Sequence, residues 1–350
     1  MSTATTTWWR AALVPVALVL LPFLALARGL ASAVAFASAI ARWAAAETRA
    51  LVSLAGADDA PLRNLDAYRG SSSAPTWAVV TGASSGVGEA VALELAANGF
   101  SVVLVARRED RLRDVARRVE EAAHPRVRAV CLPFDLSDAF ARRDELLAGV
   151  DRVTGSGDVG LVAHFAGNSD LAVHLTDKPL ARNVELLRLN VESTLVVVQL
   201  FLERLARRSA RGAIVTSGAL TAFAAVPGFA CSSANKHFIR ALTTAAAHEF
   251  RDHVDLVAAH PIAVRSEILS NAATIPAAIG ARAFARGALA ALGDGSASTC
   301  GDSLHQLVVD LMLVLPESLV RAVFARSLGT FSVWLERPID EAPLKEKLLR

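Results

Sequence analysis

The chain has 350 residues, of which 53% are apolar, and carries a formal net charge of +2. This length suits one large domain with an appendage, or two small domains. The balanced charge and the lack of a dense basic run exclude an extended nucleic-acid surface. Its three cysteines, Cys131, Cys231 and Cys300, lie far apart. Their spacing excludes a disulfide framework and gives no metal-binding motif, so we predict no metal.

The first 50 residues differ from the rest of the chain. No Asp or Glu precedes Glu47, and residues 11–27 and 29–41 are apolar on either side of Arg28. A spanning helix needs roughly 20 apolar residues, and an arginine can extend its head group to the interface. We therefore predict a membrane anchor over residues 1–50. A cleaved signal peptide, an organelle presequence and a hairpin that does not cross the bilayer remain open alternatives.

Arginines flank the apolar segment unequally. Arg10 precedes it, whereas Arg28, Arg42 and Arg49 follow its first run. The positive-inside rule then places the main domain in the cytosol. We predict a membrane location, at the endoplasmic reticulum or a lipid-droplet surface, with residues 51–75 as a polar connector.

Short apolar strands alternate with helical patterns over residues 76–270. The expected strands cover residues 77–81, 101–106, 127–132, 159–165, 212–217 and 254–260. Continuous apolar strands between helices are typical of a parallel sheet covered on both faces, so we predict an α/β, doubly wound, Rossmann-type domain. The alternation stops after Pro261, and residues 271–350 are expected to form a mostly helical extension. Its apolar stretch over residues 302–335 fits an oligomer face, a substrate lid, a membrane-resting surface or ordinary core packing.

A glycine-rich turn follows the first expected strand. Glycines in this turn let the backbone approach a pyrophosphate, whose charge then meets the N-terminus of a helix. The candidate cofactor-binding residues of the turn are Thr81, Gly82, Ser84, Ser85, Gly86, Val87 and Gly88.

The second expected strand ends in Arg107 and Arg108 rather than in an acidic residue. A guanidinium suits the 2′-phosphate of NADP, whereas Asp or Glu would grip the ribose hydroxyls of NAD. We therefore predict NADP as the cofactor, with Arg107 as a contact. Asp135, after the third strand, can accept a hydrogen bond from the adenine amino group or cap the following helix.

These motifs occur in a fixed order, continued by Ala166-Gly167, Asn190 and Lys236. The order resembles the short-chain dehydrogenase/reductase family over about residues 76–270. The anchor, "DVGLVAHFAG" and "PIAVRSEI" are similar to very-long-chain 3-oxoacyl-CoA reductases and membrane-bound hydroxysteroid dehydrogenases. The resemblance implies a lipid-like carbonyl or alcohol substrate. It also implies cofactor contacts from a set of residues: Asp135, Leu136, Ala166, Gly167, Lys236 and Ser266.

The family's catalytic pattern is incomplete in this sequence. The resemblance implies that Lys236 is the lysine and Asn190 the asparagine of the site. The tyrosine position, four residues before the lysine, holds Ser232, and the serine position holds Ala219. The single tyrosine, Tyr68, lies upstream of the nucleotide fold and cannot restore the motif by a shifted alignment.

Four further side chains either could replace a missing catalytic group or differ from the family's pattern. Ser217 can replace Ala219 if the loop shifts by two residues, and His260 is a candidate surrogate acid near the nicotinamide. His237 should point away from the catalytic face. His164 replaces part of the family's asparagine-rich turn.

Two functions follow as hypotheses. The first is a membrane-associated, NADP(H)-dependent oxidoreductase acting on a substrate such as a 3-oxoacyl-CoA or a steroid. The second is a catalytically impaired member that serves as an NADP(H)-binding scaffold or sensor. The expected partners are the lipid-like substrate and the membrane, with a homo-oligomer or a membrane-protein partner left open. An unrelated phosphate-binding α/β protein would require the Lys236 and Asn190 matches to be coincidental.

Overall fold

The computed structural model describes residues 60–70, 75–122, 126–155, 157–169, 174–226, 228–265 and 278–315, with isolated positions between 34 and 41. Apart from those isolated positions, the predicted anchor lies outside the described residues, as do Ser266 and the stretch beyond residue 315. No helix within the described ranges is long and apolar enough to cross a bilayer.

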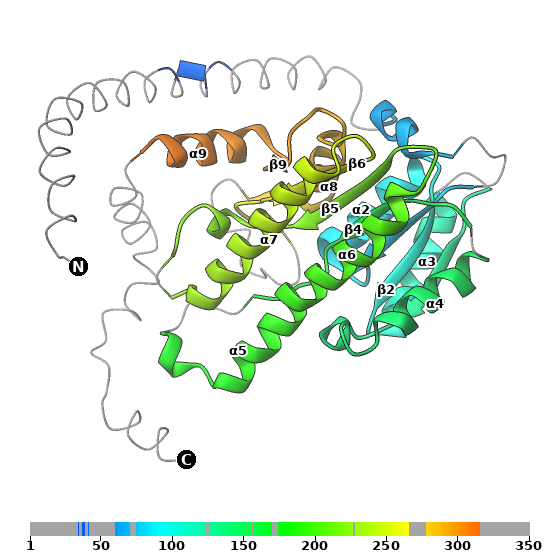
Figure 1. Ribbon diagram of the computed structural model, residues 1–350, viewed down its shortest axis with the longest axis horizontal. Coiled ribbons are helices and arrows are strands. Elements are labelled where there is room, and N and C mark those ends of the chain that lie inside the picture. Colours follow the sequence, from blue (N-terminus) through cyan, green and yellow to red (C-terminus); the bar gives the residue numbers. More distant parts are fainter. Residues whose placement is uncertain are drawn as a thin grey trace, which may run out of the picture.

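A seven-stranded parallel sheet forms the centre of the molecule (Figure 1). Its strand order is β3-β2-β1-β4-β5-β6-β9. The strands are β1 (Trp77–Thr81), β2 (Ser101–Ala106), β3 (Ala129–Pro133), β4 (Val159–His164), β5 (Gly212–Ser217), β6 (Val254–Ala259) and β9 (Ser298–Thr299). The prediction of a doubly wound parallel sheet is therefore confirmed. Residues 298–299 add a strand beside β6 that the sequence pattern did not predict, because two polar residues carry no strand signal.

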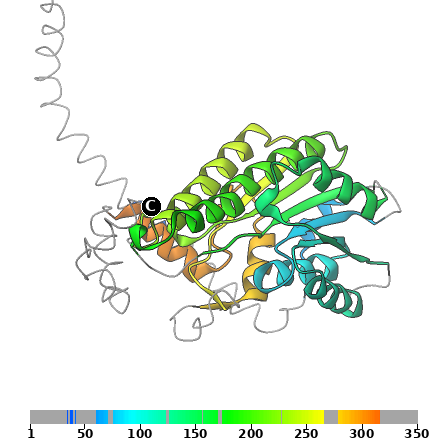
Figure 2. The ribbon, with the colours of Figure 1, turned by 90° about the horizontal axis from the view of Figure 1, so that it is seen from below.

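Helices cover both faces of this sheet (Figure 2). They are α2 (Gly86–Ala97), α3 (Glu109–Ala122), α4 (Arg143–Thr154), α5 (Leu180–Leu187), α6 (Ser193–Ala206), α7 (Ala230–Glu249), α8 (Ala281–Ala290) and α9 (Ser303–Val314). A π-helical turn, η4 (Arg188–Glu192), joins α5 to α6. The 3₁₀ turns are η1 (Arg63–Tyr68), η2 (Leu136–Asp138), η3 (Leu175–Asp177) and η5 (Leu220–Ala222), and β7 (Val264–Arg265) pairs with β8 (Ile279–Gly280).

The strand side chains alternate between two buried cores. Ala78 and Val80 of β1 pack with η1, α2, α3 and α8. Trp77 and Val79 pack with α4, α6 and α7 on the opposite face. Successive residues of a strand point to opposite faces, so a strand buried on both sides must be apolar throughout.

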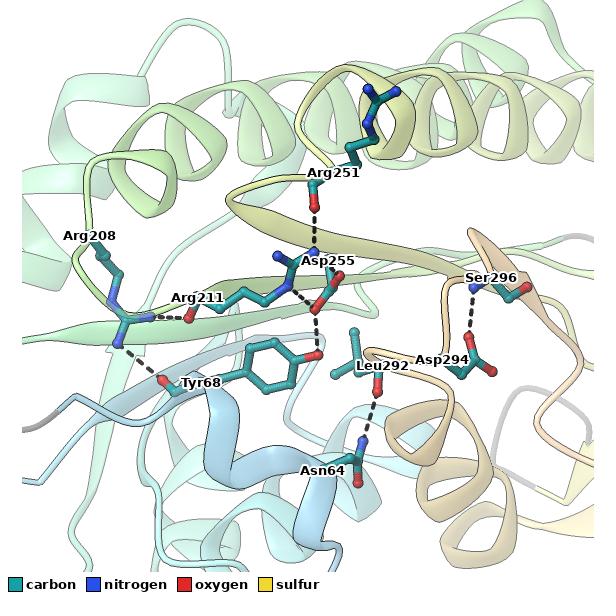
Figure 3. A network of polar contacts seen from close by, with 9 residues as sticks. All are labelled: Asn64, Tyr68, Arg208, Arg211, Arg251, Asp255, Leu292, Asp294 and Ser296. Atoms are coloured by element: carbon teal, nitrogen blue, oxygen red, sulfur yellow. Dashed lines mark hydrogen bonds and ion pairs between the residues drawn. The ribbon is translucent and has the colours of Figure 1, made fainter.

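Residues 60–70, expected as part of a polar connector, contain η1, which packs on the sheet. Leu65 and Tyr68 are both buried. Tyr68 donates a hydrogen bond to Asp255 Oδ2 (2.8 Å) at the start of β6 (Figure 3). Arg211 holds both oxygens of the Asp255 carboxylate at 2.6 Å. The segment before β1 is thus tied to the amino-terminal edge of the sheet.

Candidate functional site: a nucleotide cleft with an altered catalytic helix

The glycine-rich turn lies where the strand order reverses, between β1 and β4. A ligand crevice forms at this switch point, beyond the carboxyl ends of the strands. Gly82 adopts φ +66°, and a Cβ atom there would lie 2.7 Å from the backbone nitrogen of Ala166. A Cβ on Gly88 would lie 2.3 Å from the carbonyl oxygen of Gly82. The two positions therefore require glycine, because the turn folds back against its own helix and the neighbouring loop.

The N-terminus of α2 is open towards this turn. Ser85 is its N-cap residue, and the Ser85 side chain makes no capping hydrogen bond. A helix N-terminus offers backbone N–H groups and a partial positive charge to an anion. The glycine-rich turn and the uncapped N-terminus of α2 together fit the pyrophosphate of a dinucleotide. Ser84 and Val87 belong to the same turn and first helical residues.

His164 lies beneath the glycine-rich turn and contacts the residue at its start. Its Nδ1 lies 2.9 Å from Thr81 Oγ1, and its Nε2 lies 3.3 Å from Ser193 Oγ on α6. Thr81 Oγ1 also accepts a hydrogen bond from the backbone of Ala166 (3.1 Å). Burial, together with the nearby charge of Lys236, lowers the pKa of His164 to about 3. A neutral imidazole therefore links three elements beneath the site.

The predicted contacts on the adenosine side gather at the ends of β2 and β3. Arg107 and Asp135 approach to 3.9 Å, and the Arg107 side chain is 65% exposed. An ion pair this exposed and this long contributes little, so the guanidinium is available for a phosphate. The Asp135 carboxylate accepts a hydrogen bond from the backbone N–H of Ser137 (2.9 Å). Asp135 therefore caps the helical turn that follows β3, which is one of the two roles predicted for it. Leu136 is buried below it.

Lys236 and Asn190 meet beside the loop that follows β4. The Lys236 ammonium donates to the carbonyl oxygen of Ser217 (2.7 Å). The Asn190 amide, in the π-helical turn, binds both backbone groups of Asn168 (3.0 and 2.9 Å). A Cβ on Gly167 would lie 2.8 Å from Asn190 Oδ1 and 4.0 Å from Lys236 Nζ. The structure thus brings Gly167, Asn190 and Lys236 together, although they lie far apart in the chain.

Burial lowers the pKa of Lys236 to about 8. The side chain is 8% exposed, and no carboxylate contributes to its pKa. Desolvation penalises the charged form of a buried lysine. A ligand with hydroxyl groups, such as a ribose, would give this ammonium further acceptors.

Ser232 and Ala219, the residues expected at the family's tyrosine and serine positions, lie at the starts of two helical elements. Ser232 lies in the first turn of α7, with its Oγ 3.3 Å from Ser169 Oγ. Ala219 is the N-cap residue of η5 and has no hydroxyl to offer. Sequence reasoning missed Ser169, because the pairing joins residues 63 positions apart and no local pattern marks it.

His260 is enclosed rather than open to the cleft. Its side chain is fully buried, and neither ring nitrogen has a hydrogen-bond partner within the described part of the chain. The ring lies against Gly218, where a Cβ would come within 1.9 Å of Nδ1, and packs edge-on against Phe223. Burial, followed by the charges of Arg240 and Lys236, lowers the pKa of His260 to about 3, although the backbone of Ala219 acts in the opposite direction. A neutral, enclosed imidazole does not favour the surrogate-acid hypothesis.

The other candidate side chains lie as follows. His237 is exposed, with Nδ1 2.8 Å from the carbonyl oxygen of Ser233, so it points away from the site as expected. Ser217 offers its backbone oxygen to Lys236. Tyr68 lies at the opposite edge of the sheet. No cluster of three or more metal-ligating side chains occurs among the described residues.

A doubly wound parallel sheet with a glycine-rich turn at its switch point is the architecture typical of dinucleotide-binding proteins. The family model described as short chain dehydrogenase matches residues 76–275. The chain therefore belongs to the short-chain dehydrogenase family.

Two curated relatives illustrate the range of similar proteins. A very-long-chain 3-oxoacyl-CoA reductase from Pyricularia oryzae is 32% identical over 226 residues, covering 62% of this chain and 65% of the relative. The match therefore spans less than two thirds of that relative. The 17-beta-hydroxysteroid dehydrogenase type 3 of Rattus norvegicus is 26% identical and covers 69% of this chain and 76% of the relative.

Solved structures share the fold. A short-chain dehydrogenase from Sphingobium yanoikuyae in complex with NADPH has a TM-score of 0.58 at 24% identity, covering 76% of this chain and 98% of the other. A metagenomic short-chain oxidoreductase in complex with NADP has a TM-score of 0.54 at 29% identity, covering 65% of this chain and 97% of the other.

Proposed function

We propose that the protein is a membrane-associated, NADP(H)-dependent oxidoreductase that acts on a carbonyl or alcohol group of a lipid-like substrate. The observation that carries the proposal is the convergence of Gly167, Asn190 and Lys236 beside the glycine-rich turn. The substrate class, a 3-oxoacyl-CoA or a steroid, is taken from the names of the relatives. Arg107 supports NADP over NAD, because it presents an exposed cation where the 2′-phosphate would lie.

Each group of residues has a separate task in this proposal. The bound nicotinamide supplies or accepts the hydride. The turn from Thr81 to Gly88 binds the pyrophosphate, Lys236 binds the nicotinamide ribose, and Asn190 fixes the loop that faces it. Ser232 supplies no acid comparable to a phenol, because an aliphatic hydroxyl is far less acidic. A missing general acid lowers the rate by about 10²–10⁴-fold, so we expect slow turnover.

The replacement of the family's tyrosine and serine also favours a second candidate function. Ser232 and Ala219 remove two groups that act on the substrate oxygen, whereas the cofactor-facing residues remain. A protein of this kind can bind NADP(H) as a scaffold or sensor without reducing a substrate.

A binding titration followed by a turnover assay separates these functions. The full chain in detergent is titrated with NADPH and with NADH, and its thermal unfolding is followed. Binding to the folded state alone stabilises it by about 2.7 kcal/mol at a ligand concentration of 100 Kd. We expect stabilisation by NADPH and a weaker effect of NADH. NADPH oxidation with 3-oxoacyl-CoA and 17-oxosteroid substrates then supports the oxidoreductase, whereas binding without oxidation supports the scaffold.

Two variants test the cofactor side of the proposal. Arg107→Ala is expected to weaken NADPH binding about tenfold while NADH binding is unchanged, because only NADP carries the 2′-phosphate. Arg117→Ala, an equally exposed arginine on α3, is the matched control and should change neither. A chain that binds neither nucleotide would contradict both candidate functions.

A further inference from the structure

Two serine hydroxyls from different elements meet at the altered tyrosine position. Ser169 follows β4, Ser232 begins α7, and their Oγ atoms lie 3.3 Å apart. Both residues are half-buried. A serine at position 232 is a whole ring shorter than a tyrosine, and the Ser169 hydroxyl reaches it from the facing loop.

The loop that carries Ser169 is held firmly. Asn190 Oδ1 accepts from the backbone N–H of Asn168 (3.0 Å), and Asn190 Nδ2 donates to its carbonyl oxygen (2.9 Å). The Asn168 side chain accepts from the backbone N–H of Ser169 (2.9 Å). Asn190 is itself 2% exposed, in the π-helical turn. A polar group positioned by such a network binds a ligand at little ordering cost.

The hydroxyl pair faces the same region as Lys236. Ser232 and Lys236 are separated by four residues on α7, so they share one helix face. Gly167, two residues before Ser169, lies next to both Asn190 and Lys236. The pair therefore stands beside the place assigned to the nicotinamide ribose.

We propose that Ser169 and Ser232 together form the site that binds the carbonyl or hydroxyl oxygen of the substrate. Ser169 supplies from the β4 side the hydroxyl that Ala219 lacks on the β5 side. Each hydroxyl has one donor and two acceptor lone pairs, and its proton rotates to suit the ligand. The pair recognises an oxygen without serving as a strong acid. This assignment rests on the proposed function and adds Ser169 as a specificity-determining residue.

Matched ligands that differ by one oxygen test the assignment. The full chain in detergent, saturated with NADPH, is titrated calorimetrically with 3-hydroxypalmitoyl-CoA and with palmitoyl-CoA. A second pair is a 17β-hydroxysteroid and its 17-deoxy counterpart. For at least one pair, we expect the oxygenated ligand to bind about three- to tenfold more tightly, the range for a neutral hydrogen bond.

Substitutions then locate the preference. Ser169→Ala and Ser232→Ala should each abolish it, and the double variant should lose no more than either single one, because the hydroxyls act as a unit. Ser169→Thr keeps the hydroxyl and should retain the preference. Ser209→Ala, an exposed serine in the turn after α6, is the control. Thermal unfolding of each variant distinguishes a lost contact from a lost fold.

The inference is overturned if the wild-type chain shows no preference within either pair, or if Ser169→Ala retains it. Such a result leaves NADPH binding, and with it the proposed function, intact. Absence of NADPH binding in the wild-type chain would instead contradict the proposed function itself.

Discussion

Lys236 is a buried cation whose position has an energetic cost. Its ammonium has one backbone acceptor, Ser217 O, and burial lowers its pKa from 10.5 to about 8. Because the pKa is lower in the folded state, the protonated form of Lys236 is less stable in the folded chain than in the unfolded chain. The cost is fully present below pH 8 and is relieved as the pH rises towards the unfolded pKa. Cofactor hydroxyls at this position would offset it, which couples binding to stability.

This predicts a pH dependence of the unfolding free energy. Between about pH 8 and pH 10.5, the wild-type value should gain up to about 3 kcal/mol relative to a Lys236→Met variant, since one pKa unit corresponds to about 1.4 kcal/mol. Denaturant unfolding of both proteins without cofactor, at several pH values, gives the difference curve. A flat curve would show that Lys236 is not desolvated in the folded state.

At the scale of elements, η1 acts as a brace on the amino-terminal edge of the sheet. The Tyr68 phenol donates to Asp255, and the Tyr68 carbonyl accepts from Arg208 (3.0 Å) (Figure 3). Asn64 donates to the carbonyl oxygens of Leu289, in the last turn of α8, and of Leu292, just after it. Burial and the Asp255 hydrogen bond both raise the pKa of Tyr68. The phenol is therefore a structural hydrogen-bond donor. It lies at the edge of the sheet opposite the carboxyl ends of the strands, where the glycine-rich turn lies.

Tyr68→Phe tests this assignment. Loss of a hydrogen bond to a carboxylate should lower the unfolding free energy by about 1–2 kcal/mol, because Arg211 still neutralises Asp255. NADPH affinity and any turnover should stay unchanged. A fall in turnover without a fall in melting temperature would instead make this tyrosine the missing acid.

At the scale of the whole molecule, the fold fixes where the chain enters the domain. The predicted anchor, residues 1–50, precedes η1, which fixes the chain at the amino edge of the sheet. The glycine-rich turn lies at the other edge, beyond the carboxyl end of β1. The chain therefore enters the described domain at the edge of the sheet opposite the glycine-rich turn.

We predict that the full chain behaves as an integral membrane protein. It should stay with the membrane pellet on alkaline carbonate extraction, and Leu20→Arg/Leu21→Arg should release it, because each arginine in an apolar span costs about 2.5–3.5 kcal/mol. The control is Leu175→Arg, because Leu175 is exposed on the domain. A buried position such as Leu146 would not serve, because an arginine there would disturb the fold. Extraction of the wild-type chain, or a mature mass lacking the first residues, would favour the presequence or signal-peptide alternatives.

The layer architecture and the glycine-rich turn could be predicted from the sequence alone. Apolar strands, helix periodicity and the glycine spacing are local signals, because each depends on residues close together in the chain. The spacing of Ser232 and Lys236 is also local, since the two residues share one helix. Four features became visible only in three dimensions: the added strand at residues 298–299, the burial of η1 against the sheet, the enclosure of His260 and the pairing of Ser169 with Ser232. These features join segments far apart in sequence, and whether such side chains meet depends on packing that no local pattern records.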